Sequence, residues 1–242
     1  MTASYYAGAY WPGRRESVEE CARRAETFFR LLSRCDPIFE QWFQQANSLK
    51  KALQLQFEPT FETFVRFFSN KKHQLVEGFS LGAWTGHPEN GRSGVLSLTC
   101  GTDCDAFPNS CLLYLPWAGP EAERVLTVPV LTQVLQALVV AWEPDWAVIL
   151  PDDFREKVTP DGRTGTFVGW LTYFSKRRGQ VPPLPPPTRC QPVEDKGTLL
   201  ILTPERLSAS NAEHIALAAR SLEFLTTEKL LSPVRSPSER QH

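Results

Sequence analysis

The chain has 242 residues, of which 42% are apolar and 11% aromatic, enough to bury the core of one large domain or of two small ones. Its 26 basic and 27 acidic residues give a formal net charge of -1. Because binding to nucleic-acid phosphates needs a clear basic surplus, the overall charge argues against a direct nucleic-acid partner, and any charge-driven partner must meet a local patch.

No segment has the pattern of a membrane span or of a secretory signal. The longest uncharged stretch, residues 125–142, is interrupted by proline and polar residues and falls short of the roughly 20 apolar residues that cross a bilayer. At the start of the chain no basic residue precedes Arg14, and Gly8 and Pro12 interrupt any apolar run. We therefore expect a cytoplasmic protein with no membrane partner.

The first predicted element is a strand, YYAGAYW, at residues 5–11. Tyrosines alternate with small residues in it, which is the period-two pattern of a strand, and bulky residues at the ends leave neither face plainly solvated. This pattern favours a strand inside a sheet or under a helix, ended by Pro12-Gly13.

Two helical segments are predicted next. Ser17 and Glu20 form a capping box in front of apolar residues at helical spacing, which predicts an amphipathic helix over residues 17–34. Asp36-Pro37 opens a second helical turn that places an aromatic cluster on one side. The members of this cluster are Phe39, Trp42 and Phe43.

The middle of the chain predicts a hairpin, a further strand and a buried helix. Residues 76–86 and 93–101 have strand patterns on either side of a loop in which Asn90-Gly91 is a hairpin signal, and residues 111–115 predict a third strand. An uncharged helix then begins near Thr127 with an apolar stripe, so we expect it to be buried on most sides.

The last third of the chain predicts three strands and a final helix. Residues 146–150 are short and apolar, as in a strand at the centre of a sheet, and residues 165–175 and 197–203 predict two more strands. Ser210 and Glu213 form a second capping box, which predicts the start of the final helix.

Together these elements predict a single α+β domain over residues 1–231, with helices packed on a mainly antiparallel sheet of about six strands. A polar tail at residues 232–242 is expected to be disordered. The proline run at residues 182–187 is interpreted as an extended surface spacer, and the alternative is a scaffold that docks a partner through these prolines.

The sequence contains none of the common phosphate-loop, dinucleotide, zinc-protease or nucleophile-elbow motifs. Cys104 and His87 are possible members of a nucleophile pair, as in a small thiol-dependent hydrolase, but nothing in the sequence orients them. Cys100, Cys104 and Cys111 lack the paired spacing of structural zinc sites. We therefore expect no enzyme activity, no cofactor and no metal.

Acidic side chains flank the predicted strand at residues 146–150. Glu143 and Asp145 precede this strand, whereas Asp152 and Asp153 follow it, so the two pairs lie about 17 Å apart by the rise of a strand. That separation is too long for a glycosidase site or a two-metal site. The simpler interpretation is that these acids solvate the strand ends, and the functional one is an acidic patch for a basic protein partner.

Trp117 differs from the other six tryptophans because it follows a predicted strand and lies in a loop with proline and glycine, PWAGP. The others lie in helix or strand patterns and are expected in the core. Exposed tryptophans in loops often serve protein interfaces, so Trp117 is the candidate apolar anchor.

Several sequence words resemble the immunity protein 52 family of bacterial polymorphic toxin and type VI secretion systems. They are YYAGAYW, ESVEECARR, DPIFEQW, WTG, WEPDWAV and VGWLTYFS, in that order over nearly the whole chain. The resemblance implies an α+β immunity protein that neutralises a cognate nuclease effector toxin with a restriction-endonuclease-like fold. It transfers no catalytic residue to this chain.

The resemblance and the missing active site lead to one hypothesis, a stoichiometric protein inhibitor of a nuclease toxin. Carboxylates suit this task, because a nuclease binds phosphate through cationic residues. The predicted contact residues are two acids of the cysteine-rich loop, the four acids around the central strand and the tryptophan anchor: Asp103, Asp105, Glu143, Asp145, Asp152, Asp153 and Trp117.

Overall fold

The protein is built on one antiparallel sheet of ten strands, seen in a computed structural model that describes residues 4–104 and 108–234. Across the sheet the strands are β3 (Gln56–Phe57), β2 (Trp42–Gln44), β4 (Phe79–Trp84), β5 (Val95–Cys100), β6 (Asn109–Leu115), β1 (Tyr5–Trp11), β7 (Trp146–Pro151), β8 (Leu171–Ser175), β10 (Gly197–Ile201) and β9 (Arg189–Val193).

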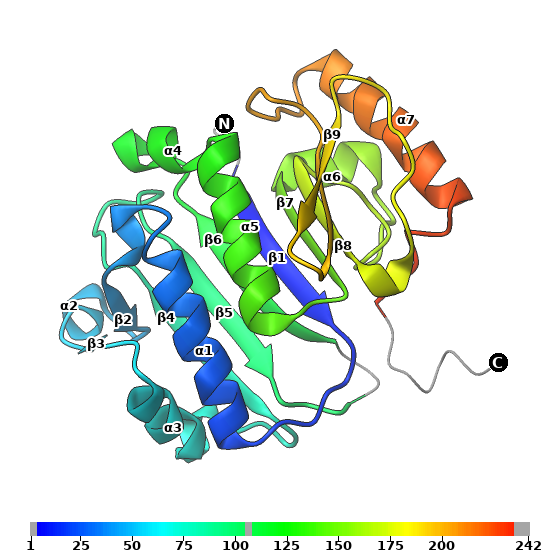
Figure 1. Cartoon of the computed structure of the whole chain (residues 1–242). Helices are drawn as coiled ribbons and strands as arrows, with labels where there is room; N and C mark the ends of the chain where they lie inside the picture. Colours follow the sequence, from blue (N-terminus) through cyan, green and yellow to red (C-terminus); the bar gives the residue numbers. More distant parts are fainter. Residues whose placement is uncertain (1–3, 105–107, 235–242) are drawn as a thin grey trace.

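Helices cover one face of the sheet on the side of β4, β5, β6 and β1. Figure 1 shows α1 (Val18–Leu32) and α5 (Val128–Trp142) side by side over these strands, and α3 (Phe61–Ser69) packs against α1. Beyond β7, α6 (Asp152–Val158) contacts α7 (Ala212–Thr227). The short helices in the described residues are α2 (Leu49–Ala52), α4 (Gly119–Val125), η1 (Pro37–Phe39), η2 (Lys71–His73) and η3 (Lys176–Arg178).

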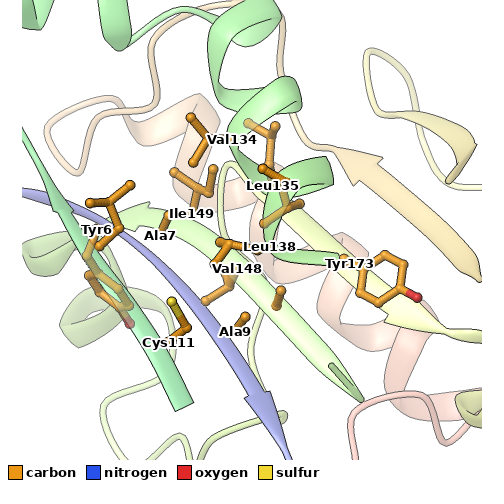
Figure 2. Close-up of a cluster of buried hydrophobic side chains, with 14 of the residues drawn as sticks. Tyr6, Ala7, Ala9, Cys111, Val134, Leu135, Leu138, Val148, Ile149 and Tyr173 are labelled. Carbon is orange, nitrogen blue, oxygen red and sulfur yellow. The ribbon is translucent and has the colours of Figure 1, made fainter. Parts of the chain in front are cut away.

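The first strand lies at the centre of the sheet, as its sequence pattern predicts. β1 is paired along its length with β6 on one side and with β7 on the other. Ala7 and Ala9 are small enough to admit α5, and Figure 2 shows both in one cluster with Val134 and Leu138 of that helix. The small residues of YYAGAYW therefore set the distance between the sheet and its helical layer.

The predicted start of α1 is confirmed in atomic detail. The Ser17 hydroxyl accepts a hydrogen bond from the Glu20 amide at 3.2 Å, and the Glu20 carboxylate accepts one from the Ser17 amide at 2.8 Å. These two bonds satisfy two of the backbone donors that a helix leaves without partners at its start.

Replacing Ser17 with alanine is expected to lower the free energy of unfolding by about 1 kcal/mol, because one half of the capping box is lost. Chemical denaturation followed by circular dichroism measures this change. Ser17→Thr keeps the hydroxyl and should retain most of the stability, so an equal loss in both variants would contradict the capping role.

Some predicted elements differ from the structure. Asp36 caps a single 3-10 turn, after which Trp42–Gln44 forms a strand instead of continuing a helix. The sheet has ten strands rather than about six because β2, β3 and β9 were not predicted: two are very short, and Pro192 interrupts the polar edge strand β9.

The C-terminal elements also begin later than predicted. β8 starts only at Leu171, because the residues before it leave the strand pairing and lie over the sheet. The backbone of Gly169 lies against Val148 and Ile149, and a Cβ on Gly169 would meet the Ile149 carbonyl at 2.5 Å. The final helix is capped by Asn211, whose side chain accepts from the Glu213 amide, and not by Ser210.

No single helix in the described part of the chain is long and apolar enough to cross a membrane, and α4 and α5 pass that test only as a pair bent by 77°. The predicted tail is described only as far as Val234, so the disorder expected for most of it lies outside the described residues.

Candidate protein-binding surface

Half of the sheet has one face under helices and an opposite face that is partly exposed, although Tyr6 and Gly8 on it are buried. Residues alternate along β4, β5 and β6 between fully buried positions, such as Leu96 and Leu113, and half-buried or exposed ones. The register aligns the second set with the even-numbered residues of β1. We call this set the open face: Ser80, Gly82, Trp84, Val95, Ser97, Thr99, Ser110, Leu112, Tyr114, Tyr6, Gly8 and Tyr10.

None of the open-face positions carries a charged side chain. The solvated face of an antiparallel sheet usually alternates polar and charged residues with the buried ones. Here it consists instead of aromatic, aliphatic, small and hydroxyl side chains. Centres of protein interfaces are similarly depleted of charge and enriched in tyrosine and tryptophan.

Aromatic rings form the central strip of the open face. Tyr6 and Tyr114 lie with their ring centroids 6.2 Å apart, and Tyr114 is 44% exposed. Burial raises the pKa of Tyr6 to about 12 and also raises the pKa of Tyr10. Both hydroxyls are therefore protonated at neutral pH, and the nearby Arg155 partly offsets the rise in the pKa of Tyr6.

The open face ends where β7 begins. Phe167 packs edge-on against Trp146 at 4.8 Å between centroids, and the guanidinium of Arg155 in α6 lies 4.8 Å from the Phe167 ring. Trp146, the cross-strand neighbour of Tyr10, is thereby fully buried. This side of the sheet is therefore covered from β7 onward and more exposed on β4, β5 and β6.

A hollow of about 850 Å³ lies at the end of the open face near Tyr10, and we call it the Tyr10 hollow. Leu75 and Val76 line it from the segment before β4, and Asp103 lines it from the loop after β5. Val76 is fully exposed and Leu75 is 45% exposed. A second hollow of about 710 Å³ shares Val76, Glu77 and Asp103 and is also lined by Glu20 and by Arg15.

The predicted contact residues separate to the two ends of β1. Asp145 donates its backbone N–H to Tyr10, at the same end as Asp103, whereas Asp152 donates to Ser4 at the opposite end. Trp117 follows Leu115, the partner of Tyr5, so it lies at the Ser4 end too. One continuous acidic patch is therefore absent among them, and Asp105 lies outside the described residues.

Two of the predicted acids belong to ion pairs within the protein. Asp145 is buried, and its carboxylate accepts hydrogen bonds from Arg178 at 2.8 Å and from Ser175 at 3.1 Å. Glu143 is paired with Lys196 at 2.9 Å and with Arg24 at 3.3 Å. The hydrogen bond from Lys196 is the main cause of the lowered pKa of Glu143.

Asp152 and Asp153 begin α6 and are exposed. The Ser4 hydroxyl donates a hydrogen bond to Asp152. Negative charge in the first turn favours a helix, so part of the role of these two residues is to start α6, an element that the sequence patterns did not predict.

Trp117 is not a free anchor. It is half-buried, its indole ring lies against Gly91 in the loop between β4 and β5, and its backbone N–H donates to the Gly91 carbonyl at 2.8 Å. Gly91 has a φ of 81°, and a Cβ there would meet the ring at 2.7 Å. The predicted hairpin signal, Asn90-Gly91, and the predicted anchor, Trp117, therefore contact each other within the protein.

An ion pair closes the same loop and predicts a pH dependence. Two hydrogen bonds of 2.8 Å from Arg92 lower the pKa of Glu121 to about 2. Since this folded-state pKa lies below the ordinary value of 4.5, the stabilisation is present above about pH 4.5 and is lost as the pH falls toward 2. In Glu121→Gln, the free energy of unfolding should fall less steeply between pH 5 and pH 2, as measured by denaturation at several pH values.

Glu123→Gln is the matched control for Glu121→Gln, since the Glu123 side chain is 79% exposed in its pair with Arg206. We expect the control to keep the wild-type slope. Equal slopes in wild type and in Glu121→Gln would contradict the role of the Arg92 pair.

The structure separates the residues of the predicted thiol enzyme. His87 follows β4 and Cys104 follows β5, so they lie at opposite ends of this antiparallel pair, about 17 Å apart by the rise of six-residue strands. A nucleophile and its base must lie within hydrogen-bonding distance. Cys100 and Cys111 are buried with raised pKa values, and no cluster in the described residues could hold a metal ion.

The proline run is tied to the body of the protein. Val181 and Leu184 pack against the core, and Thr188 donates its N–H to Pro185 at 3.1 Å. These contacts favour the spacer interpretation of residues 182–187 over a freely presented ligand.

Sequence reasoning missed the open face, although a signal for it exists. The strands FSLGAW, VLSLTC and NSCLLYL each bury alternate residues, and the intervening positions hold serine, threonine, glycine or apolar residues but no charge. A period-two pattern whose outer positions lack charge indicates a covered or partner-facing surface.

Comparisons with known proteins identify a family for the chain and a solved structure of similar fold. The family model described as Immunity protein 52 matches residues 3–234. Among solved structures, the T6SS protein PA0821 of Pseudomonas aeruginosa is similar in fold, with a TM-score of 0.54 and 13% sequence identity over 91% of this chain and 72% of that chain. No curated protein matches the chain.

Proposed function

The chain belongs to the immunity protein 52 family, and from this premise we propose that it binds a cognate secreted toxin and neutralises it as a stoichiometric inhibitor. An immunity protein acts by binding and not by catalysis, in agreement with the prediction that this chain is not an enzyme. The observation that supports binding is the open face, a set of uncharged sheet positions on the side opposite to α1 and α5.

The proposed toxin is a nuclease with a restriction-endonuclease-like fold that acts in the cytoplasm, where we propose that this protein also acts. The sequence words suggest a pair similar to the antidote TsiT and its nuclease effector TseT. Support comes from charge: Glu77 and Asp103 are exposed, and neither forms an ion pair within the described residues. Carboxylates of this kind attract the cationic surface with which a nuclease holds phosphate.

Of the predicted contact residues, three exposed acids are retained in the proposal: Asp103, Asp152 and Asp153. Glu143 is partly neutralised by Lys196 and Arg24, and Asp145 is withdrawn because it is buried against Arg178. DNase and immunity pairs reach dissociation constants near 10⁻¹³ to 10⁻¹⁶ M, and specific interfaces of this kind bury roughly 1,600 Å² or more.

The test is a titration of this protein into the toxin domain encoded by the neighbouring gene, with calorimetry and DNA cleavage followed in parallel. Tight one-to-one binding with loss of cleavage would support the proposal. Tight binding to a toxin that does not cut DNA would overturn the nuclease assignment and leave the inhibitor role. No binding at micromolar concentrations would overturn the inhibitor role for this pair.

A further inference from the structure

The open face differs from the rest of the surface in composition and in location. Ser97 and Tyr114 are exposed, Leu112 between them is half-buried, and none of the three is charged. Tyrosine offers a large, rigid contact area at a low entropic cost, and serine offers adaptable hydrogen bonds. A sheet face of this composition has the makeup of the centre of a protein interface.

The margin at the Tyr10 hollow is acidic. Glu77 and Asp103 line the hollow, and none of the described residues that line it is basic. Tyr10 lines the same hollow, and an aromatic ring attracts a cation that approaches its face. The hollow therefore offers carboxylates and an aromatic wall to a single cationic side chain.

We infer that the toxin docks on the open face and places a lysine or arginine side chain in the Tyr10 hollow. This inference rests on the proposed function. The apolar centre of the toxin surface contacts the strip from Tyr6 to Tyr114, and its basic residue meets Glu77 and Asp103. Val76, which projects fully from the margin, packs against the toxin beside that basic residue.

This location assigns different roles to the two faces of the sheet. The face under α1 and α5 is occupied by the core and supplies stability. The opposite face is formed by the paired strands β4, β5, β6 and β1, so we expect little rearrangement of its backbone before binding. A preorganised surface of this kind lowers the entropic cost of association.

The first experiment introduces a charge at the centre of the open face. Ser97→Arg should weaken binding of the neighbouring-gene toxin domain by about 100-fold or more, because an unpaired and like-charged group is forced into the interface. Ser69→Arg is the matched control: Ser69 is exposed at the end of α3, on the helical side. The control should bind as tightly as the wild type.

A second variant keeps the test valid if Ser97→Arg folds poorly by circular dichroism. Tyr114→Ala removes an exposed ring without adding charge, and we expect binding to weaken by about tenfold or more. Unchanged affinity in a folded Tyr114→Ala or Ser97→Arg variant would overturn the open-face inference.

The charge of the hollow is tested separately. The double variant Glu77→Lys and Asp103→Lys should weaken binding by about tenfold or more, with slower association and less dependence on salt. Glu58→Lys with Glu62→Lys makes the same change in net charge at exposed positions near α3 and should have little effect. Equal effects of the two double variants would overturn the inference that a basic toxin residue enters the Tyr10 hollow.

The wild-type titration separates the two proposals. If the wild type does not bind the toxin, the proposed function fails for this pair. If the wild type binds and a folded Ser97→Arg or Tyr114→Ala variant binds equally well, the inhibitor role stands and the location is wrong. If sedimentation shows a dimer that Ser97→Arg dissociates, the open face is an interface between two copies of this chain, and the docking inference is overturned.

Discussion

Replacing Trp142 with alanine is expected to lower the free energy of unfolding by about 3–5 kcal/mol. Trp142 is fully buried at the end of α5 and stacks on Trp11 of β1 at 5.3 Å between ring centroids. The Phe28 ring of α1 lies 6.4 Å away. One side chain therefore joins the central strand to both helices of the layer above it.

Denaturation by urea, followed by far-ultraviolet circular dichroism, measures the loss without relying on tryptophan fluorescence. Trp117→Ala is the control, because Trp117 is half-buried in a loop contact and its removal should cost clearly less. A loss in Trp142→Ala no larger than that in Trp117→Ala would show that the stacked pair is not central to stability.

The second large effect is expected from Arg178→Met, which should cost about 3–5 kcal/mol because it leaves the carboxylate of Asp145 buried and without its main cationic partner. The side chains of Arg178 and Asp145 are only 5% and 9% exposed. Arg178 also donates to the carbonyls of Gly165 and Leu230, so it connects the start of β7 with the C-terminal segment.

Two comparisons distinguish the ion pair from general packing. Glu123→Ala breaks the more exposed pair with Arg206 and should change stability by no more than about 0.5 kcal/mol. In a double-mutant cycle, Asp145→Leu combined with Arg178→Met should cost less than the sum of the single changes. Additive losses would contradict a direct coupling between Asp145 and Arg178.

Elements with a strong local signal were predicted well from the sequence. The capping box of α1, the alternation in β1 and the uncharged helix α5 each depend on residues within a few positions of one another. Local spacing decides such features, because helix caps and strand periods are formed by near neighbours in the chain.

The candidate site was predicted less well, because its properties depend on distant residues. Asp145 was predicted as a surface acid, and its buried partner Arg178 lies 33 positions further along the chain. Glu143 was also predicted as a surface acid. Its partner Lys196 comes from the turn between β9 and β10, and its partner Arg24 comes from α1. No local pattern shows whether a carboxylate meets solvent or an arginine.

The amino-acid sequence by itself determined the class of the domain, its central strand, its main helices and its family, because these follow from period, caps and sequence words within short segments. Only the tertiary structure decided which acids are neutralised and which strand face is uncovered. Both depend on contacts between segments far apart in the chain. Because α1, α3 and α5 all lie on one side of the sheet, the uncharged face of β4, β5, β6 and β1 on the other side is available to a partner.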